Sequence, residues 1–580
     1  MFGLNLPATA GSPNEIFIAP VGSGGPMIGE PYDGDSKPLV FGKSTAAFFT
    51  QQLSTEIEFK FGQKTMGGDS RGNGEQPDLA DPSLTGRRND ALDYALPSRR
   101  TADALLGIFW NLIYPIYPFL DPLSFEKDYQ AIWLGSETAS EESTILATLN
   151  MVFALATSVS SHVQPEQRQE SAKVFYDRAR AFLDGLSWDT GSIELLSYLM
   201  LTAIYLQTLD ASQRCWMVVG HAIRMAESLG FHLPNSSIYK QCPRKVELAR
   251  RLWHGCVLLD RVLSMTLGRP EMITTDLSTD VHLPTDMEDD AIATLLGRPI
   301  GVEGPSCLAA FYVHQLRFYK VVSDILRNVY PSNMDRHRTS ADVVTILRLD
   351  NDIVAWNKNL PQGIKDSACG LVGHESLSRL AIINHVRLLH ARILLFRPLL
   401  AQFCFKREGN GLESATIESL ADRLVVQCSN LCLRASHQMI HVIHANLDRT
   451  TVTGPLPSWW YCVLYVYTAA TVLLAERLQP VIAEGVSEYS TVNSWKYAME
   501  ILQAYARVGN SARTCTAMLQ TLSSHIPPAS NDETINNTVT AFDGESAMSL
   551  FEYLREDAGL YGANFDTSEV LWTNSLPGSL

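Results

Sequence analysis

Apolar residues recur at intervals of three and four over most of this sequence, and this spacing restricts the fold more than any other feature. Two such stripes are Leu196, Leu199, Met200 and Ala203, and then Trp216, Val219, Ile223 and Ala226. Spacings of three and four place side chains on one face of a helix, and Gly230 would end the second helix. Strand-like alternation is nearly absent between Pro97 and Ile526. The pattern therefore predicts an all-α domain.

The same periodicity predicts further helices and the way in which they pack. They are expected over residues 144–158, 171–183, 246–267, 307–330, 341–357, 377–403, 417–445, 458–478 and 492–522. Their apolar faces are broad, so each helix has to be covered by others. We expect a large multi-helix bundle built from helical hairpins over residues 96–526.

The two ends of the chain have a different composition. Residues 1–95 are rich in Gly, Pro, Ser and Asp, which bury too little apolar surface to offset the entropy of ordering, and they predict a mostly disordered leader. One apolar island, residues 40–49, interrupts it. Residues 527–580 form an acidic tail with scattered aromatic residues. Such a tail is typical of segments that dock into a partner's groove, and a solubilising tail is the alternative.

Charge and cysteine content exclude several classes of protein. The 46 basic and 62 acidic residues give a formal net charge of −16, the wrong sign for a protein that binds phosphates, and no locally basic module is present. The ten cysteines lie between Cys215 and Cys515 in helix-patterned segments, which indicates buried thiols in a reducing compartment. Residues 105–120 and 459–475 are apolar but short for membrane spans, and we expect both to be core segments, with no membrane contact.

One cluster of metal-binding residue types fails on geometry. Cys428, Cys432, His437 and His441 resemble a zinc finger by residue type, but only four residues separate the two pairs within one predicted helix. At about 100° per residue the cysteines and the histidines lie on opposite faces and cannot share a metal ion. We expect the cysteines in the core and the histidines beside a second contact face.

No catalytic or cofactor-binding motif is recognisable. The acidic run at residues 286–290 follows Pro284 and has no second acidic motif to complete a metal site, so we interpret it as a solvated loop. A nucleophile elbow and a Walker loop are also missing from the sequence. We therefore predict that the chain is not an enzyme and that it holds no cofactor.

The most distinctive motif spans the predicted helix 246–267 and its exit. Its residues are Arg250, Arg251, Trp253, Asp260, Arg261, Gly268, Arg269 and Pro270. Arg250 and Asp260 are ten residues apart, nearly three turns, so they cannot pair with each other. We expect each to find a partner on a neighbouring helix, with Trp253 filling the crevice between. Gly268 should end the helix and Pro270 should force an extended exit. The motif is interpreted as a structural clamp, with a ligand-sensing wall as the alternative.

These passages, in their order and spacing, resemble the fungal-specific transcription factor domain, the middle homology region of zinc binuclear cluster transcription factors. Other passages that carry the likeness are residues 41–45, 114–120, 193–207, 394–398 and 457–460. His254 stands where the family typically has a second aromatic residue. The resemblance covers roughly residues 97–525.

The resemblance implies a nuclear regulator of transcription by RNA polymerase II, acting on a pathway or a gene cluster. Members read DNA through six cysteines that bind two zinc ions, but no cysteine precedes Cys215 here. Either the chain starts downstream of a missing exon, or it acts through partners. DNA would then be contacted only through a module supplied elsewhere.

The expected partners are coactivators or the transcription machinery, bound by the acidic tail, while a small-molecule effector and a homodimer stay open. The alternative from another class is a helical small-molecule-binding or enzymatic protein with no role in transcription.

Overall fold

A computed structural model of the chain describes ten stretches of the sequence. They are residues 43–61, 96–183, 191–209, 211–274, 280–285, 304–330, 343–368, 375–405, 420–479 and 490–527. Within these stretches the backbone is helical apart from turns and short loops, and the only β-type pairing is an isolated bridge between Asp448 and Thr453. The all-α prediction is confirmed. The acidic tail and the acidic run at residues 286–290 lie outside the described residues.

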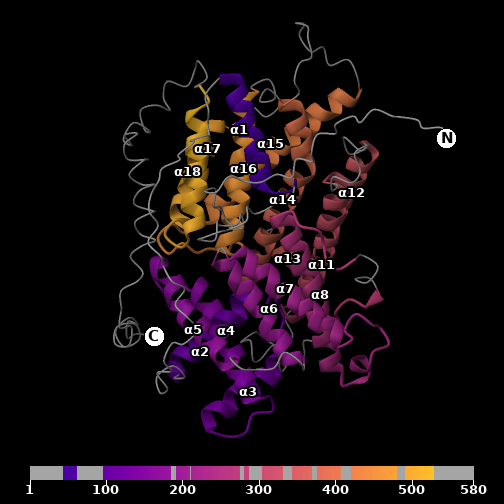
Figure 1. Cartoon of the computed structure of the whole chain (residues 1–580), viewed down its shortest axis with the longest axis vertical. Helices are drawn as coiled ribbons and strands as arrows, with labels where there is room; N and C mark the ends of the chain where they lie inside the picture. Colours follow the sequence, from indigo (N-terminus) through magenta and orange to yellow (C-terminus); the bar gives the residue numbers. More distant parts are fainter. Residues whose placement is uncertain are drawn as a thin grey trace, which may run out of the picture.

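Figure 1 labels the helices in chain order. In the first part of the chain they are α1 (Ala46–Phe61), α2 (Arg99–Ile108), η1 (Phe109–Ile113), α3 (Pro122–Leu134), α4 (Glu142–Val159), η2 (Pro165–Gln167), α5 (Arg168–Leu183), α6 (Ile193–Thr208), α7 (Ser212–Ser228), η3 (Ser237–Lys240) and α8 (Pro243–Leu267). In the second part they are α11 (Gly304–Val329), α12 (Val343–Lys358), α13 (Gln362–Ala368), α14 (Glu375–Cys404), α15 (Leu420–Asn446), α16 (Trp459–Leu478), α17 (Thr491–Tyr505) and α18 (Asn510–Ser524).

Helical hairpins build the two ends of the molecule. Helices α4 and α5, α6 and α7, and α14 and α15 pack as sequential pairs, as predicted. Figure 1 shows α2 to α6 gathered at one end of the long axis and α14 to α18 at the other, with α8 and α11 between them. The buried side chains of both ends form one continuous core. The two groups of hairpins therefore share a single hydrophobic interior.

Helix α1 begins in the apolar island at residues 40–49, which interrupts the stretch that the composition assigned to a mostly disordered leader. Phe49, Leu53 and Ile57 are fully buried at spacings of four, because α1 packs against α16 among the C-terminal helices (Figure 1). The Thr50 hydroxyl lies 2.8 Å from that of Tyr467. The folded unit thus includes residues well before position 96.

In the part of the chain that the structure describes, two helices, α4 and α16, are long and apolar enough to cross a membrane by length and composition alone. Both are packed inside the molecule, with 78% and 94% of their most apolar windows buried. Residues 105–120 likewise lie almost wholly in the core. The burial is what core helices show, in line with the prediction for residues 105–120 and 459–475.

The predicted single helix over residues 492–522 is in fact two helices, α17 and α18, joined at Gly509. A Cβ atom on Gly509 would lie 2.3 Å from the ring of Trp459, so the connection passes too close to α16 for any side chain. Periodicity could not reveal this break, because the apolar spacing continues across it. The cause is a tertiary contact.

Candidate functional site

The distinctive motif lies on α8, which runs through the middle of the domain. Pro243 occupies the first turn, where its missing N–H costs nothing, and Gly268 ends the helix with φ of +65°. From Ala249 onward nearly every side chain of α8 is buried. A helix buried on all sides is a central one, and its polar groups need partners inside the protein.

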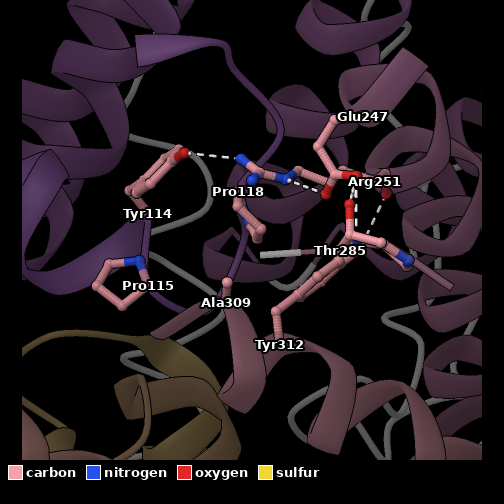
Figure 2. Close-up of a pocket in the computed structure, with 9 residues that line it drawn as sticks. Tyr114, Pro115, Pro118, Glu247, Arg251, Thr285, Ala309 and Tyr312 are labelled. Carbon is pink, nitrogen blue, oxygen red and sulfur yellow. Dashed lines mark hydrogen bonds and ion pairs between the residues drawn. The ribbon is translucent and has the colours of Figure 1, made fainter. Parts of the chain in front are cut away.

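Arg251 is the centre of a buried polar network on α8 (Figure 2). Its Nε donates to Glu247 Oε1 at 3.1 Å, and its Nη1 donates to the hydroxyl of Tyr114 at 3.0 Å. The other carboxylate oxygen of Glu247 accepts two hydrogen bonds from Thr285, from its N–H at 3.0 Å and its hydroxyl at 3.1 Å. Tyr312 on α11 donates to the carbonyl of Arg251 at 2.9 Å. The ion pair thus joins α8 to two other segments, and the backbone of Arg251 joins it to a third.

A pocket opens beside this network. It is lined by Tyr114, Pro115, Pro118, Glu247, Arg251, Pro284, Thr285, Ala309 and Tyr312. The proline and tyrosine rings make its walls mostly apolar, and the Arg251–Glu247 pair is the charged group within it. Burial raises the pKa of Tyr312 well above its ordinary value, so its hydroxyl stays a neutral donor. Such a lining suits binding or packing, because the acid and base of the pair already neutralise each other.

The wall formed by Tyr114, Pro115 and Pro118 owes its position to a π-helical turn. Helix α2 continues directly into η1, and Tyr114 caps it by donating its N–H to the carbonyl of Phe109, five residues back. Prolines at positions 115 and 118 then prevent further helix. The chain leaves α2 displaced toward α8, which brings the Tyr114 hydroxyl to Arg251. A π-turn of this kind is frequent at functional sites.

Trp253 and Gly255, further along α8, are both closely packed. Trp253 is fully buried, with its ring centroid 6.0 Å from that of His232. A Cβ atom on Gly255 would lie 2.4 Å from the ring of Phe119, so only glycine allows this approach. His254, the departure from the family pattern, faces the carbonyl of His282 at 3.1 Å, and burial lowers its pKa to about 4. It is therefore a neutral, structural side chain.

Asp260 does not bind a neighbouring helix, so the prediction is wrong for this residue. Its Oδ2 accepts the backbone N–H groups of Met272 at 2.8 Å and Ile273 at 2.9 Å, in the extended segment that follows α8. Burial raises the pKa of Asp260 to about 6. Arg261 beside it is also buried, and burial lowers its pKa. Asp260 fixes the exit path that Gly268 begins.

The remaining motif residues connect both ends of α8 to neighbouring helices. Arg269 stacks on the ring of Trp216 at 4.3 Å and donates to Gln213 Oε1 at 2.7 Å, which joins the exit to α7. Arg250, near the start, lies over the ring of Tyr239 in η3 at 6.0 Å, so it does have a neighbouring helical partner. Pro270 is exposed. The motif residues therefore spread along the whole helix, and only Arg251 reaches the pocket.

Sequence reasoning did not single out Glu247, Tyr114 or Thr285 as site residues. The spacing of four between Glu247 and Arg251 is the one available signal, since residues so spaced pair on a helix. Tyr114 and Thr285 are separated from α8 in sequence, and no sequence pattern predicts their contact with it.

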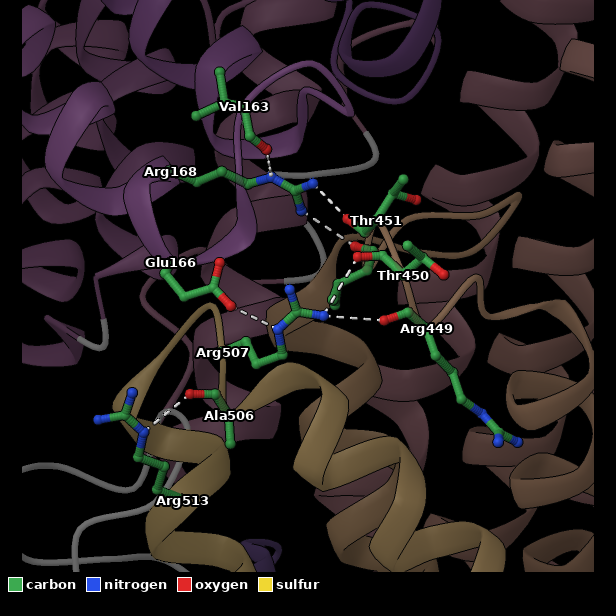
Figure 3. Close-up of polar contacts among 10 residues, drawn as sticks. Val163, Glu166, Arg168, Arg449, Thr450, Thr451, Ala506, Arg507 and Arg513 are labelled. Carbon is green, nitrogen blue, oxygen red and sulfur yellow. Dashed lines mark hydrogen bonds and ion pairs between the residues drawn. The ribbon is translucent and has the colours of Figure 1, made fainter. Parts of the chain in front are cut away.

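A second polar network joins the two ends of the molecule (Figure 3). Arg168 is 2% exposed and donates to the carbonyls of Val163, Val452 and Thr451, at 3.1, 3.2 and 2.5 Å. Arg507 pairs with Glu166 at 2.6 Å and donates to the carbonyls of two residues in the same α15–α16 loop. Both arginines thereby hold this loop from opposite sides.

The cysteines and histidines of the α15 cluster lie in different surroundings. Cys428 and Cys432 are buried in the core, as predicted. On another face His437 and His441 meet the Ser494 hydroxyl of α17 at 2.8 and 3.1 Å. Among the described residues no group of three or more His, Cys, Asp or Glu side chains is arranged to hold a metal ion. The second contact face is confirmed.

Comparison with protein families identifies the region that contains this site. Residues 106–358 match the fungal specific transcription factor domain, a stretch that includes α8, α11 and the whole pocket lining. No solved structure matches the chain.

Curated relatives are fungal transcription factors. Sorbicillinoid biosynthetic cluster transcription factor 2 of Penicillium rubens is 28% identical over 437 residues, which cover 74% of this chain and 61% of the relative. Sorbicillinoid biosynthetic cluster transcription factor sor3 of Hypocrea jecorina is 28% identical over 499 residues, covering 84% and 68%. Lactose regulatory protein LAC9 of Kluyveromyces lactis is 24% identical over 396 residues, covering 66% and 39%. The chain thus spans about two thirds or less of the length of these relatives.

Proposed function

Because residues 106–358 carry a fungal specific transcription factor domain, we propose that this protein regulates transcription by RNA polymerase II in a fungus. The observation that carries the proposal is the domain match, which is supported by relatives named as transcription factors over most of the chain. Nuclear localisation follows from the same role. The helical domain acts as the regulatory part of the protein, with the buried network of Arg251 holding its central helix in place.

We further propose that the targets are genes of one biosynthetic cluster. The support comes from two relatives whose names refer to a biosynthetic cluster. In the fungus that encodes the protein, deleting its gene should lower transcripts of a contiguous group of genes. Scattered changes, with no neighbouring genes among them, would contradict this proposal.

DNA contact is assigned to a module outside these residues. No cysteine precedes Cys215, and we propose that the chain lacks the six-cysteine zinc cluster of the family and itself holds no zinc. The net charge of −16 also opposes binding to phosphates through the general surface. A partner or a further module would therefore bring the domain to DNA.

A fusion experiment tests the regulatory role. Residues 1–580 joined to a foreign DNA-binding domain should change the output of a reporter gene in yeast. The same fusion ending at residue 526 should lose activation if the acidic tail recruits coactivators. Equal output from both fusions would remove the tail from the proposal. No change by either fusion, with both proteins present in the nucleus, would contradict the regulatory role.

A further inference from the structure

A second buried site lies where α6, α11, α14, α16 and the segment after η1 meet. Its centre is Arg387 on α14, which is 6% exposed. Arg387 Nη1 donates to Gln315 Oε1 of α11 at 2.7 Å, and the guanidinium lies 5.8 Å from the ring centroid of Tyr319. Within the described stretches of the chain, no Asp or Glu lies at ion-pair distance from Arg387. A buried guanidinium is thus left without a counter-ion.

Tyrosine hydroxyls surround this charge. Four of them lie within electrostatic range of Arg387, namely those of Tyr117, Tyr319, Tyr461 and Tyr465. All four side chains are buried. Burial raises the pKa of Tyr117 to about 12 and that of Tyr465 well above its ordinary value, so these phenols are neutral and can donate hydrogen bonds.

The site holds buried hydrogen-bond donors that have no acceptor among the described residues. Tyr461 donates to Gln207 Oε1 at 2.7 Å, as Arg387 does to Gln315 Oε1, so both amide oxygens already accept a hydrogen bond. Gln207 and Gln315 are each 1% exposed, and among the described residues neither Nε2 atom has a hydrogen-bond partner. Buried donors without acceptors are costly. The guanidinium and the two amide nitrogens can only donate, whereas each phenol can both donate and accept.

A second positive charge borders the site. Arg379 lies about two turns before Arg387 on α14 and is partly buried. Its Nη1 donates to the carbonyl of Leu112 in η1 at 2.9 Å. Burial lowers its pKa to about 10, which leaves it charged at neutral pH. The site therefore combines positive charge with unused donors. Both are what an anion with acceptor oxygens requires.

We propose that the Arg387 site binds the carboxylate of a small organic acid. A carboxylate supplies only acceptors and fits the planar fork of a guanidinium, and its single charge matches the single fully buried arginine. Tyr312 of the pocket in Figure 2 is three residues before Gln315 on α11, so the pocket and the site occupy successive turns of one helix. The idea that acid binding controls transcription rests on the proposed function. The proposal that the site binds an acid does not.

The test measures binding of simple acids to the purified full-length chain at constant ionic strength. Sodium acetate and sodium benzoate are the probes, and acetamide and benzamide are their uncharged counterparts of similar shape. Isothermal titration should show saturable one-to-one binding of at least one acid, at least about tenfold tighter than its amide. That acid should also raise the melting temperature. Equal behaviour of acid and amide in both pairs, or no saturable binding of either acid, would overturn the proposal.

Variants assign the binding to this site. Arg387→Gln keeps donors but removes the charge, and should weaken acid binding about a hundredfold. Tyr465→Phe removes one hydroxyl without changing shape, and should weaken it about tenfold. Tyr467→Phe is the matched control on the same helix, because its hydroxyl lies beside Thr50 and away from the site, and it should bind as the native chain does. Unaltered binding by both Arg387→Gln and Tyr465→Phe would place the acid elsewhere and overturn the assignment.

The reporter fusion separates this inference from the proposed function. Acid binding without any reporter activity would leave the site intact and contradict the regulatory role. Reporter activity without acid binding would support the regulatory role and contradict the acid-binding site.

Discussion

Arg168, Arg379 and Arg397 each donate hydrogen bonds to backbone carbonyls of segments distant in sequence. Arg397, in the stretch at residues 394–398, donates to the carbonyl of Ser44 at 2.5 Å and lies 5.4 Å from the ring of Phe49. The resemblance had drawn on both residues 41–45 and 394–398, and the structure places them in contact. A guanidinium carries several donors in a fixed plane, so one side chain can bind more than one segment. These contacts connect regions that no local pattern links.

Trp253 should contribute strongly to stability, because its ring is fully buried beside His232. We expect Trp253→Ala to lower the free energy of unfolding by roughly 3–5 kcal/mol, through lost burial and the cavity left behind. Chemical denaturation followed by circular dichroism measures this. Leu134→Ala is the control, since Leu134 is 75% exposed, and it should change stability by less than about 0.5 kcal/mol. An unchanged midpoint for Trp253→Ala would favour a ligand role instead.

Two glycines should respond in opposite directions to the same substitution. Gly255→Ala places a methyl group against Phe119 and should destabilise by about 1–3 kcal/mol. Gly107→Ala, in α2, meets nothing within 4 Å and should stabilise by up to about 1 kcal/mol, because alanine favours helix. Melting temperatures of the two variants give the signs. A stable Gly255→Ala protein would mean that α8 and Phe119 are not held as closely as described.

At the scale of helices, periodicity located most of the fold. The predicted helix 246–267 corresponds to α8, and 458–478 to α16, because long apolar stripes leave little choice of structure. Helix α1 escaped prediction since its neighbours in sequence are rich in Gly and Pro and its partner α16 is far along the chain. The division at Gly509 escaped for a related reason, the approach of Trp459. Both depend on tertiary contacts.

The candidate pocket likewise has one part that the sequence predicts and another that depends on tertiary contacts. The Glu247–Arg251 pair could be read from its spacing, but Tyr114 reaches Arg251 only because η1 is a π-turn. Such a turn has no sequence signature in the apolar pattern. The part of the site on α8 could therefore be predicted, whereas the residues that reach it from other segments could not.

If α1 is part of the folded unit, its buried face should matter to the stability of the whole domain. Leu53→Ala should destabilise by about 2–5 kcal/mol, because Leu53 is fully buried against the C-terminal helices. Phe59→Ala on the same helix is the control, since Phe59 is 68% exposed and should have little effect. Thermal unfolding of the full chain distinguishes them. Equal melting temperatures for both variants would show that α1 contributes nothing.

For the molecule as a whole, buried neutral histidines should make stability depend on pH. Burial lowers the pKa of His254 and His314 to about 4 and that of His390 to about 3. The unfolded chain therefore binds more protons than the folded chain below pH 6.5, and stability should fall as pH drops from about 6.5 toward 4. Asp260 opposes this with one carboxyl, since its raised pKa of about 6 favours the folded state in acid.

The pH dependence is measured by melting temperature between pH 7 and 5. His314→Gln removes one buried histidine and should give a shallower decline, by about 1.4 kcal/mol per pH unit at most. His162→Gln, at an exposed position, should decline in parallel with the native chain. Parallel curves for His314→Gln and the native chain would show that His314 does not stay neutral in the fold.

The pairing of α1 with α16 means that α1 cannot reach its native contacts until late in synthesis. Thr50 and Tyr467 are 417 residues apart, so α1 leaves the ribosome long before its partner helix exists. At about 5–20 residues per second the wait is roughly 20–80 s. For that interval the apolar face of Phe49, Leu53 and Ile57 has no native surface to cover it. Nascent chains of this protein should therefore engage a chaperone early, and release should coincide with emergence of α16.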